Sequence, residues 1–136
     1  MPSPRGAWLE GAKPRKTGED DIQINLVKHL QWRAAPGVIW FMIPNGTNKS
    51  KAAAGKAKAM GLRKGASDMG FIIPPHGQAA MLELKFGKNK PSPEQEQFGV
   101  EVEAAGAFFA VAWSLDQAIG ILQAWGCLKP DKGEFN

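Results

Sequence analysis

Cysteine and histidine are scarce in this chain. Its 136 residues contain one cysteine, Cys127, and two histidines, His29 and His76. A single cysteine excludes an intrachain disulfide framework and fits a reducing compartment, so we expect the protein to reside in the cytoplasm. These soft ligands are too few for a structural zinc site. Neither histidine has a partner base or nucleophile in the pattern, so we expect no catalytic role for either.

Long apolar runs are also missing. No stretch of ~18 apolar residues is available to cross a bilayer, so we expect no membrane partner. Residues 1–18 are rich in Pro, Gly and Lys and lack the apolar centre of a signal peptide, which indicates a flexible arm. Residues 127–136 have turn residues without periodicity, and we expect a loose tail there. The length of residues 19–126 fits one domain.

Helical and strand periodicities alternate through this domain, which predicts an α/β fold with a mixed central sheet flanked by helices. Ser92 and Ser114 are expected N-caps, with Pro93 at the first position of its helix. Phe98, Val102 and Ala105 should form the buried side of that helix. The strand at 107–113 is apolar throughout and is expected in the interior of the sheet. The expected helices are 18–34, a Lys/Ala-rich segment before Asp68, 92–106 and 114–126, and the expected strands are 37–46, 69–73, 79–86 and 107–113.

Three charged side chains are expected close together near the middle of the chain. Asp68 directly precedes one apolar strand, and Glu83 and Lys85 lie within the next strand. The turn-forming sequence PPHG between the two strands predicts a hairpin. Strand side chains alternate between faces, so Glu83 and Lys85 should project to the same side.

Two neighbouring carboxylates repel one another unless a cation joins them. Asp68 and Glu83 carry hard oxygen ligands, which favour Mg²⁺ or Mn²⁺ over zinc. A metal there would polarise a phosphoryl oxygen, and the Lys85 ammonium would orient water or stabilise negative charge on phosphorus. The alternative is an exposed ion-pair cluster with little energetic effect. The apolar character of the strand that holds Glu83 favours the metal site.

The segment before Asp68 carries only basic charges. This distribution attracts a phosphate backbone, in line with a net charge of +4 for the whole chain. Two pairs of lysines seven residues apart lie on different helical faces, so we expect one pair to meet nucleic acid directly. The alternative is a solvated helix, because lysine is a good exposed helix former. The six residues are Lys49, Lys51, Lys56, Lys58, Arg63 and Lys64.

Together these motifs resemble the VRR-NUC branch of the PD-(D/E)xK nuclease superfamily. The likeness runs from Glu19 to about Trp125 and includes the PNG turn, a G-x-x-x-G-x-x-D segment ending at Asp68, the E-x-K at positions 83 to 85, S-x-E-Q at positions 92 to 95, and the SLDQA stretch. One departure is Ser67, where the superfamily often has Pro; that Pro shapes a turn and binds no metal. The resemblance implies a restriction-endonuclease-like core.

The resemblance also implies roles for individual residues. Asp68 and Glu83 would hold one or two Mg²⁺ or Mn²⁺ ions, with the Leu84 carbonyl completing the metal shell. An acid of the first helix would add an oxygen to the metal, directly or through water, and we assign this role to Glu19, with Asp20 as the substitute candidate; the alternative is a plain acidic helix start. Lys85 would steer water. The glutamines that would support the site by hydrogen bonding are Gln95 and Gln23.

The activity implied by the resemblance is metal-dependent cleavage of DNA by an endonuclease. Standalone VRR-NUC modules are similar to phage-encoded proteins, which suggests a bacterial or phage-infected cell, and some resolve four-way (Holliday) junctions as homodimers. A chain this small has little surface for base readout, which favours recognition of branched shape. The alternatives are a sequence-specific restriction-type endonuclease, a non-catalytic DNA-binding module, and a structural subunit of a larger phage or helicase assembly.

Overall fold

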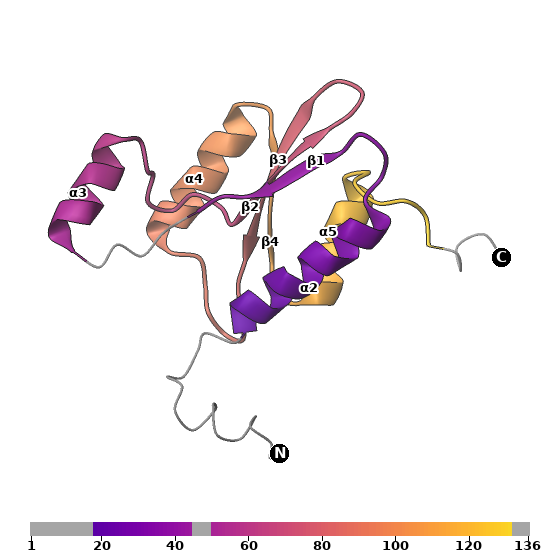
Figure 1. Ribbon diagram of the computed structural model, residues 1–136, viewed down its shortest axis with the longest axis horizontal. Coiled ribbons are helices and arrows are strands. Elements are labelled where there is room, and N and C mark those ends of the chain that lie inside the picture. The colour runs from indigo at the N-terminus through magenta and orange to yellow at the C-terminus, as the bar shows by residue number, and fades with distance from the viewer. Residues whose placement is uncertain (1–17, 45–49, 132–136) are drawn as a thin grey trace, which may run out of the picture.

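The order of helices and strands agrees with the order expected from the sequence. The structure is a computed structural model that describes residues 18–44 and 50–131. The elements, labelled as in Figure 1, are α2 (Gly18–Arg33), β1 (Ile39–Met42), α3 (Lys51–Ala59), β2 (Met69–Ile73), β3 (Gln78–Leu84), α4 (Pro93–Ala104), β4 (Phe108–Ala112) and α5 (Leu115–Ala124). Three expectations lie outside the described residues: the N-terminal arm at residues 1–17, the end of the tail at residues 132–136, and Lys49.

The four strands form one mixed sheet in the order β1-β2-β3-β4. β1 and β2 pair antiparallel, β2 and β3 form the expected antiparallel hairpin, and β3 and β4 pair parallel. β4 is therefore an edge strand, and its expected interior position is wrong. Helices cover both of its faces, since α4 and α5 both contact it. This cover explains why the strand is apolar throughout although it has only one strand neighbour.

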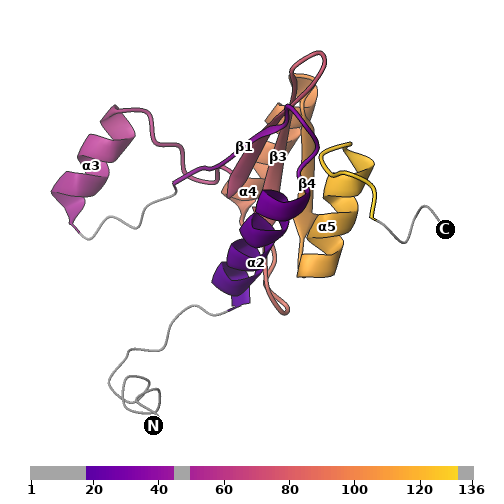
Figure 2. The ribbon, with the colours of Figure 1, turned by 45° about the vertical axis from the view of Figure 1, so that its right-hand side comes forward.

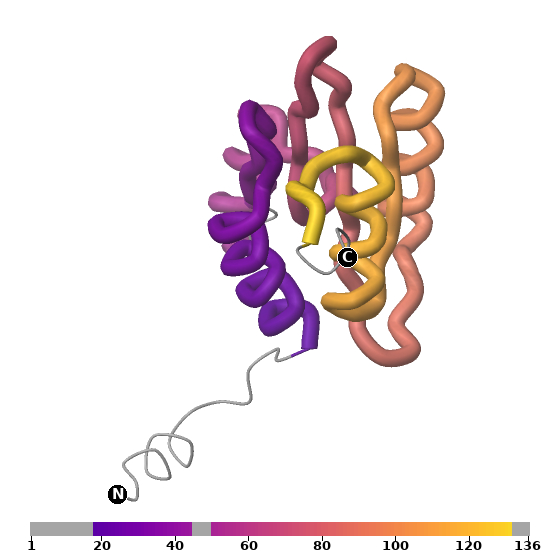
Figure 3. Tube along the Cα trace, turned by 90° about the vertical axis from the view of Figure 1, so that its right-hand side faces the viewer, coloured from indigo at the N-terminus to yellow at the C-terminus, as the bar shows by residue number. Residues whose placement is uncertain are grey.

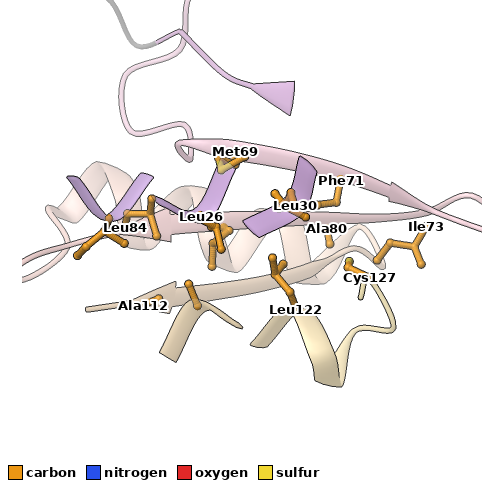
Figure 4. Close-up of a cluster of buried hydrophobic side chains, with 13 residues drawn as sticks. Leu26, Leu30, Met69, Phe71, Ile73, Ala80, Leu84, Ala112, Leu122 and Cys127 are labelled. Carbon is orange, nitrogen blue, oxygen red and sulfur yellow. The ribbon is translucent and has the colours of Figure 1, made fainter. Parts of the chain in front are cut away.

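The helices form layers on the two faces of the sheet. α2 and α5 pack side by side on one face, while α4 lies on the other (Figures 2 and 3). The apolar stripe of α2, Ile22, Leu26 and Leu30, is buried as its periodicity predicts. Figure 4 shows Leu26 and Leu30 of this stripe beside side chains of the sheet and of α5 in the main hydrophobic core. Among the described residues, no helix is both long and apolar enough to cross a membrane.

α4 begins with the capping interactions that its sequence predicts. The Ser92 side chain accepts a hydrogen bond from the Gln95 backbone N–H, and the Gln95 side chain accepts one from the Ser92 backbone N–H. Its buried side differs from the expectation. Phe98 is half-buried and Ala105 is exposed, whereas Gly99 is buried, and a Cβ at Gly99 would lie 2.5 Å from the Phe109 ring. The helix packs on β4 through its backbone at this glycine.

The segment after α5 corrects the expectation of a loose tail that begins at residue 127. Cys127 is fully buried in the core, and its carbonyl accepts a hydrogen bond from the Ala35 N–H at 2.8 Å. The Lys129 carbonyl accepts a 2.6 Å hydrogen bond from Nε of the buried Arg33. Burial raises the pKa of the Cys127 thiol to about 11, so this cysteine acts as a small core residue. The described end of the chain therefore closes the core beside α2.

Candidate active site

The β2–β3 hairpin places Asp68 beside the end of β3. The Asp68 backbone N–H donates to the Leu82 carbonyl at 3.1 Å, which extends the strand ladder by one residue. The Leu84 N–H donates to Oδ2 of Asp68 at 2.7 Å. The N–H and carbonyl of one strand residue point to the same side, so the Leu84 carbonyl is directed to the edge where Asp68 lies. The hairpin thus brings together Asp68 and Leu84, two of the residues that the sequence predicts as metal ligands.

Glu83 is a buried carboxyl with one partnered and one unpartnered oxygen. Only 2% of the residue is exposed. Its Oε2 accepts a hydrogen bond from Nε2 of Gln95 at 2.7 Å and lies 3.7 Å from Nζ of Lys85. Its Oε1 is buried and has no hydrogen-bond partner within residues 18–44 and 50–131. Glu83 and Lys85, which directly follows β3, share a site, as their spacing of two residues predicts.

The surroundings of Glu83 disfavour its charged form. Burial and the neighbouring Asp68 raise its pKa from an ordinary 4.5 to about 8, and Glu19 adds a smaller effect in the same direction. The nearby Lys85 ammonium opposes these effects without cancelling them. Among the described residues, the positive charge of Lys85 therefore does not offset the burial of Glu83 and its repulsion by Asp68. A bound cation would supply further positive charge.

A cavity of about 640 Å³ opens over these groups. Glu19 at the start of α2 lines it, so the structure places this acid at the predicted site. The substitute candidate Asp20 lies elsewhere. Asp20 and Gln23 line a second hollow, beside Met42 of β1, so Gln23 is not brought to the cavity with Gln95. The polar residues that line the cavity from α2, from α4 and its N-cap, and from the two strands and the residues next to them are Glu19, Asp68, Glu83, Lys85, Ser92 and Gln95.

The oxygen atoms of this site fit a hard divalent cation. Asp68, Glu83 and the Leu84 carbonyl offer only oxygen, and among the described residues Oε1 of Glu83 has no hydrogen-bond donor that would compete with a cation. Mg²⁺ is commonly held by one or two carboxylates and keeps several of its waters. In the described part of the chain no three Asp, Glu, His or Cys side chains are grouped closely enough to enclose an ion. Glu19 therefore lines the cavity without joining the other two acids in such a group.

The predicted basic residues divide into two groups. α3 buries none of its residues and stands away from the sheet (Figures 1 and 2), with Lys51 and Lys56 exposed on it. Lys58 of α3 lines the cavity. Arg63 and Lys64 line it too, but they form ion pairs with α4, the first to Glu101 at 3.0 Å and the second to Glu94 at 3.6 Å. A basic run in the sequence does not reveal these acidic partners.

Sequence reasoning missed several residues that shape the cavity. Gly65 lines it and touches the backbone of α4, and Leu62 and Ala54 form part of its wall. Phe98 lies under the guanidinium of Arg63, with 5.0 Å between that group and the ring centre. The Gly-rich run before Asp68 was the available signal for a close approach of the loop. The residues that this loop contacts are set by the tertiary structure, so the sequence does not reveal them.

The sequence matches no protein-family model and no curated protein. Comparison with solved structures finds the same fold in a chain described as a VRR_NUC domain protein, with a TM-score of 0.66 and 20% identity over 84% of this chain and 90% of the other. A second structure, described as a VRR_NUC domain, has a TM-score of 0.55 and 19% identity over 79% of this chain and 97% of the other. The expected mixed α/β architecture is confirmed, and the chain has the fold of these VRR_NUC domain structures.

Proposed function

We propose that this chain is a metal-dependent endonuclease that hydrolyses phosphodiester bonds in DNA. The main support is the convergence of Asp68, Glu83 and Lys85 in one cavity, where a buried oxygen of Glu83 has no hydrogen-bond partner in the described part of the chain. The fold shared with VRR_NUC domain structures supports the same reading of the motifs. A surface ion-pair cluster would leave these groups exposed, whereas the Lys85 and Glu83 side chains are only 12% and 3% exposed.

The residues of the cavity have distinct roles in this proposal. Asp68, Glu83 and the Leu84 carbonyl hold Mg²⁺ or Mn²⁺, which when bound polarises the scissile phosphate and lowers the pKa of water. Lys85 presents its ammonium to the attacking water and to the charge that develops on phosphorus. Gln95 holds Glu83 in place through Oε2 and leaves Oε1 available to the metal. Glu19 orients water at the rim of the cavity.

DNA reaches this cavity along α3. Lys51, Lys56 and Lys58 are carried on a helix with no acid in its sequence and no buried side chain. Such a helix contributes attraction to phosphates without base readout. The lack of any further recognition element in the described residues favours selection by DNA shape, and a four-way junction is the substrate that we propose.

The proposed active form is a homodimer, because paired cuts across a junction need two sites. An uncovered apolar area on β1 and β2 supports this. Ile39 and Ile72 are register partners and are 55% and 40% exposed, and Phe41 beside them covers Gly70. Exposed apolar patches of this kind mark interaction sites. Sedimentation of the wild type and of Ile39→Lys tests the assignment: a dimer that the variant dissociates is expected, and a wild-type monomer at micromolar concentration would contradict it.

Cleavage of end-labelled DNA tests the function. A four-way junction, a flap and a linear duplex of matched length are incubated at one salt concentration with Mg²⁺ or with EDTA. We expect cleavage of the junction in Mg²⁺ only, and no cleavage by Asp68→Asn, which should still bind the junction. Equal cleavage of the three substrates would refute shape selection, discrete fragments from plasmid DNA would indicate a restriction-type enzyme, and binding without products would indicate a non-catalytic module.

A further inference from the structure

The loop between α3 and β2 is attached to one stripe of α4. Glu94, Phe98 and Glu101 follow one another at spacings of four and three residues, so they share a helical face. Lys64 pairs with Glu94 at 3.6 Å. The Arg63 guanidinium lies over the Phe98 ring at 5.0 Å and donates to Glu101 at 3.0 Å. Two successive loop residues therefore contact three successive positions of the stripe.

The next residue of the loop makes the contact closer. Gly65 has a φ of +91°, a conformation that favours glycine, and a Cβ there would lie 2.6 Å from the backbone carbonyl of Glu94. The backbones of the loop and of α4 thus touch where the two ion pairs flank them. One exposed ion pair contributes little alone. Here two ion pairs, a ring contact and a backbone contact act on the same three successive residues, 63–65.

This stretch leads directly to Asp68. Ser67, the residue directly before Asp68, is fully buried, so a displacement of the loop is transmitted to Asp68. The first turn of α4 also holds the second acid, since Gln95 donates to Glu83 at 2.7 Å. One helix therefore positions both carboxylates, Glu83 through Gln95 and Asp68 through the loop.

We propose that Arg63 and Lys64 are positioning residues that clamp the Asp68 loop to α4, and that they are not contacts to DNA phosphate. The inference rests on the proposed function and revises which basic residues serve it. Breaking either pair to reach a phosphate would leave Glu101 or Glu94 unneutralised beside the DNA backbone, and that repulsion opposes the exchange. Lys58 has no such cost, since it lines the same cavity with no ion pair among the described residues.

Charge-removing variants of both partners separate the two roles. Arg63→Gln, Glu101→Gln and their double variant are compared with Lys58→Gln, which removes one positive charge from the same cavity. Three quantities are measured: kcat on a labelled junction, Kd for that junction in EDTA, and hydrogen exchange of backbone amides 62–67 without DNA. The exchange measurement needs no activity, so it tests the clamp even if the chain does not cleave DNA.

The clamp predicts that both single variants lose kcat by roughly five- to tenfold, because small displacements of catalytic groups are costly. The double variant should lose no more than the worse single variant, since one interaction is removed in each case. Kd should stay within about twofold in these variants and rise about threefold in Lys58→Gln, which loses a phosphate contact. The exchange rates of amides 62–67 should be higher in both clamp variants than in the wild type. In Lys58→Gln they should equal those of the wild type.

The opposite pattern would overturn the inference. A direct DNA contact predicts that Arg63→Gln raises Kd as much as Lys58→Gln, while Glu101→Gln tightens binding by freeing the guanidinium. Exchange that does not change in either clamp variant would also overturn it, and so would faster exchange with wild-type kcat. A conservative variant gives a further readout: Arg63→Lys keeps the ion pair and should retain most of the kcat that Arg63→Gln loses. A variant with only a general folding defect would instead show slower cleavage together with faster exchange across the whole domain.

Discussion

Replacement of Glu83 by glutamine should stabilise the metal-free protein at alkaline pH. Glutamine has nearly the same shape, its side-chain oxygen can still accept the hydrogen bond from Gln95, and it carries no charge to be desolvated or repelled by Asp68. The pKa of Glu83 is about 8 in the folded chain and near 4.5 when unfolded. Folding therefore favours the protonated form, and the ionised form lowers the free energy of unfolding.

The sign and window of the effect follow from these two pKa values. Below about pH 4.5 the carboxyl is protonated in both states and has no differential effect. As the pH rises toward 8, the unfolded chain releases the proton more readily, and wild-type stability falls. A difference of one pKa unit corresponds to about 1.4 kcal/mol, so the loss reaches on the order of 3–5 kcal/mol above pH 8. For a domain of this size, that is a difference in Tm of roughly 10 °C or more.

Thermal unfolding in EDTA at pH 5 and pH 9 measures this difference. Glu83→Gln and the wild type should unfold at similar temperatures at pH 5, and the variant should unfold at a clearly higher temperature at pH 9. Glu103→Gln, which changes an exposed carboxyl of α4, is the matched control. Its unfolding temperature should not rise above that of the wild type at pH 9. Equal Tm values for Glu83→Gln and wild type at pH 9, or the same gain at both pH values, would refute the account of the buried carboxylate.

Four further outcomes test the site. Lys85→Met should lower kcat at least about a hundredfold with little change in DNA affinity, as measured by cleavage and by binding in EDTA, because the ammonium acts on the developing charge. Mn²⁺ affinity measured by calorimetry should rise up to about tenfold per pH unit toward pH 8, because binding displaces the Glu83 proton, and a flat profile would contradict this. Gln95→Ala should lower the unfolding free energy by about 1 kcal/mol through loss of the capping box, seen in urea titration. Gly65→Ala should cost about 1–3 kcal/mol in the same titration, because the positive φ and the Glu94 backbone both oppose a Cβ.

Local signals in the sequence sufficed for most of the fold and for the central pair of acids. The Pro-Pro-His-Gly turn and the alternation around Glu83 predict the hairpin, and a hairpin of fixed register brings residue 68 to the end of β3. The Ser-x-x-Gln pattern likewise predicts the start of α4. These features depend on residues within about twenty positions of one another, and local periodicity and turn chemistry carry that information.

The errors concern features set by tertiary packing. The apolar pattern of β4 is the same whether strands or helices surround it, so the sequence did not distinguish an edge from an interior strand. Residues after α5 lack periodicity, yet Cys127 is buried because the chain turns back over α2. The rotation of α2 about its axis places Glu19 at the cavity and Gln23 at another hollow. Only the packed structure reveals that Arg63 has an acidic partner thirty-eight residues later.

The exposure of α3 has a consequence for how the protein can change over time. Because this helix buries no side chain, the hydrophobic core places no constraint on its sequence. Mutations there alter surface charge at little cost to folding, since exposed substitutions usually change stability by about 0.5 kcal/mol or less. Substitutions on α3 could therefore change the positive charge beside the cavity while the packing of β3 in the core stays the same.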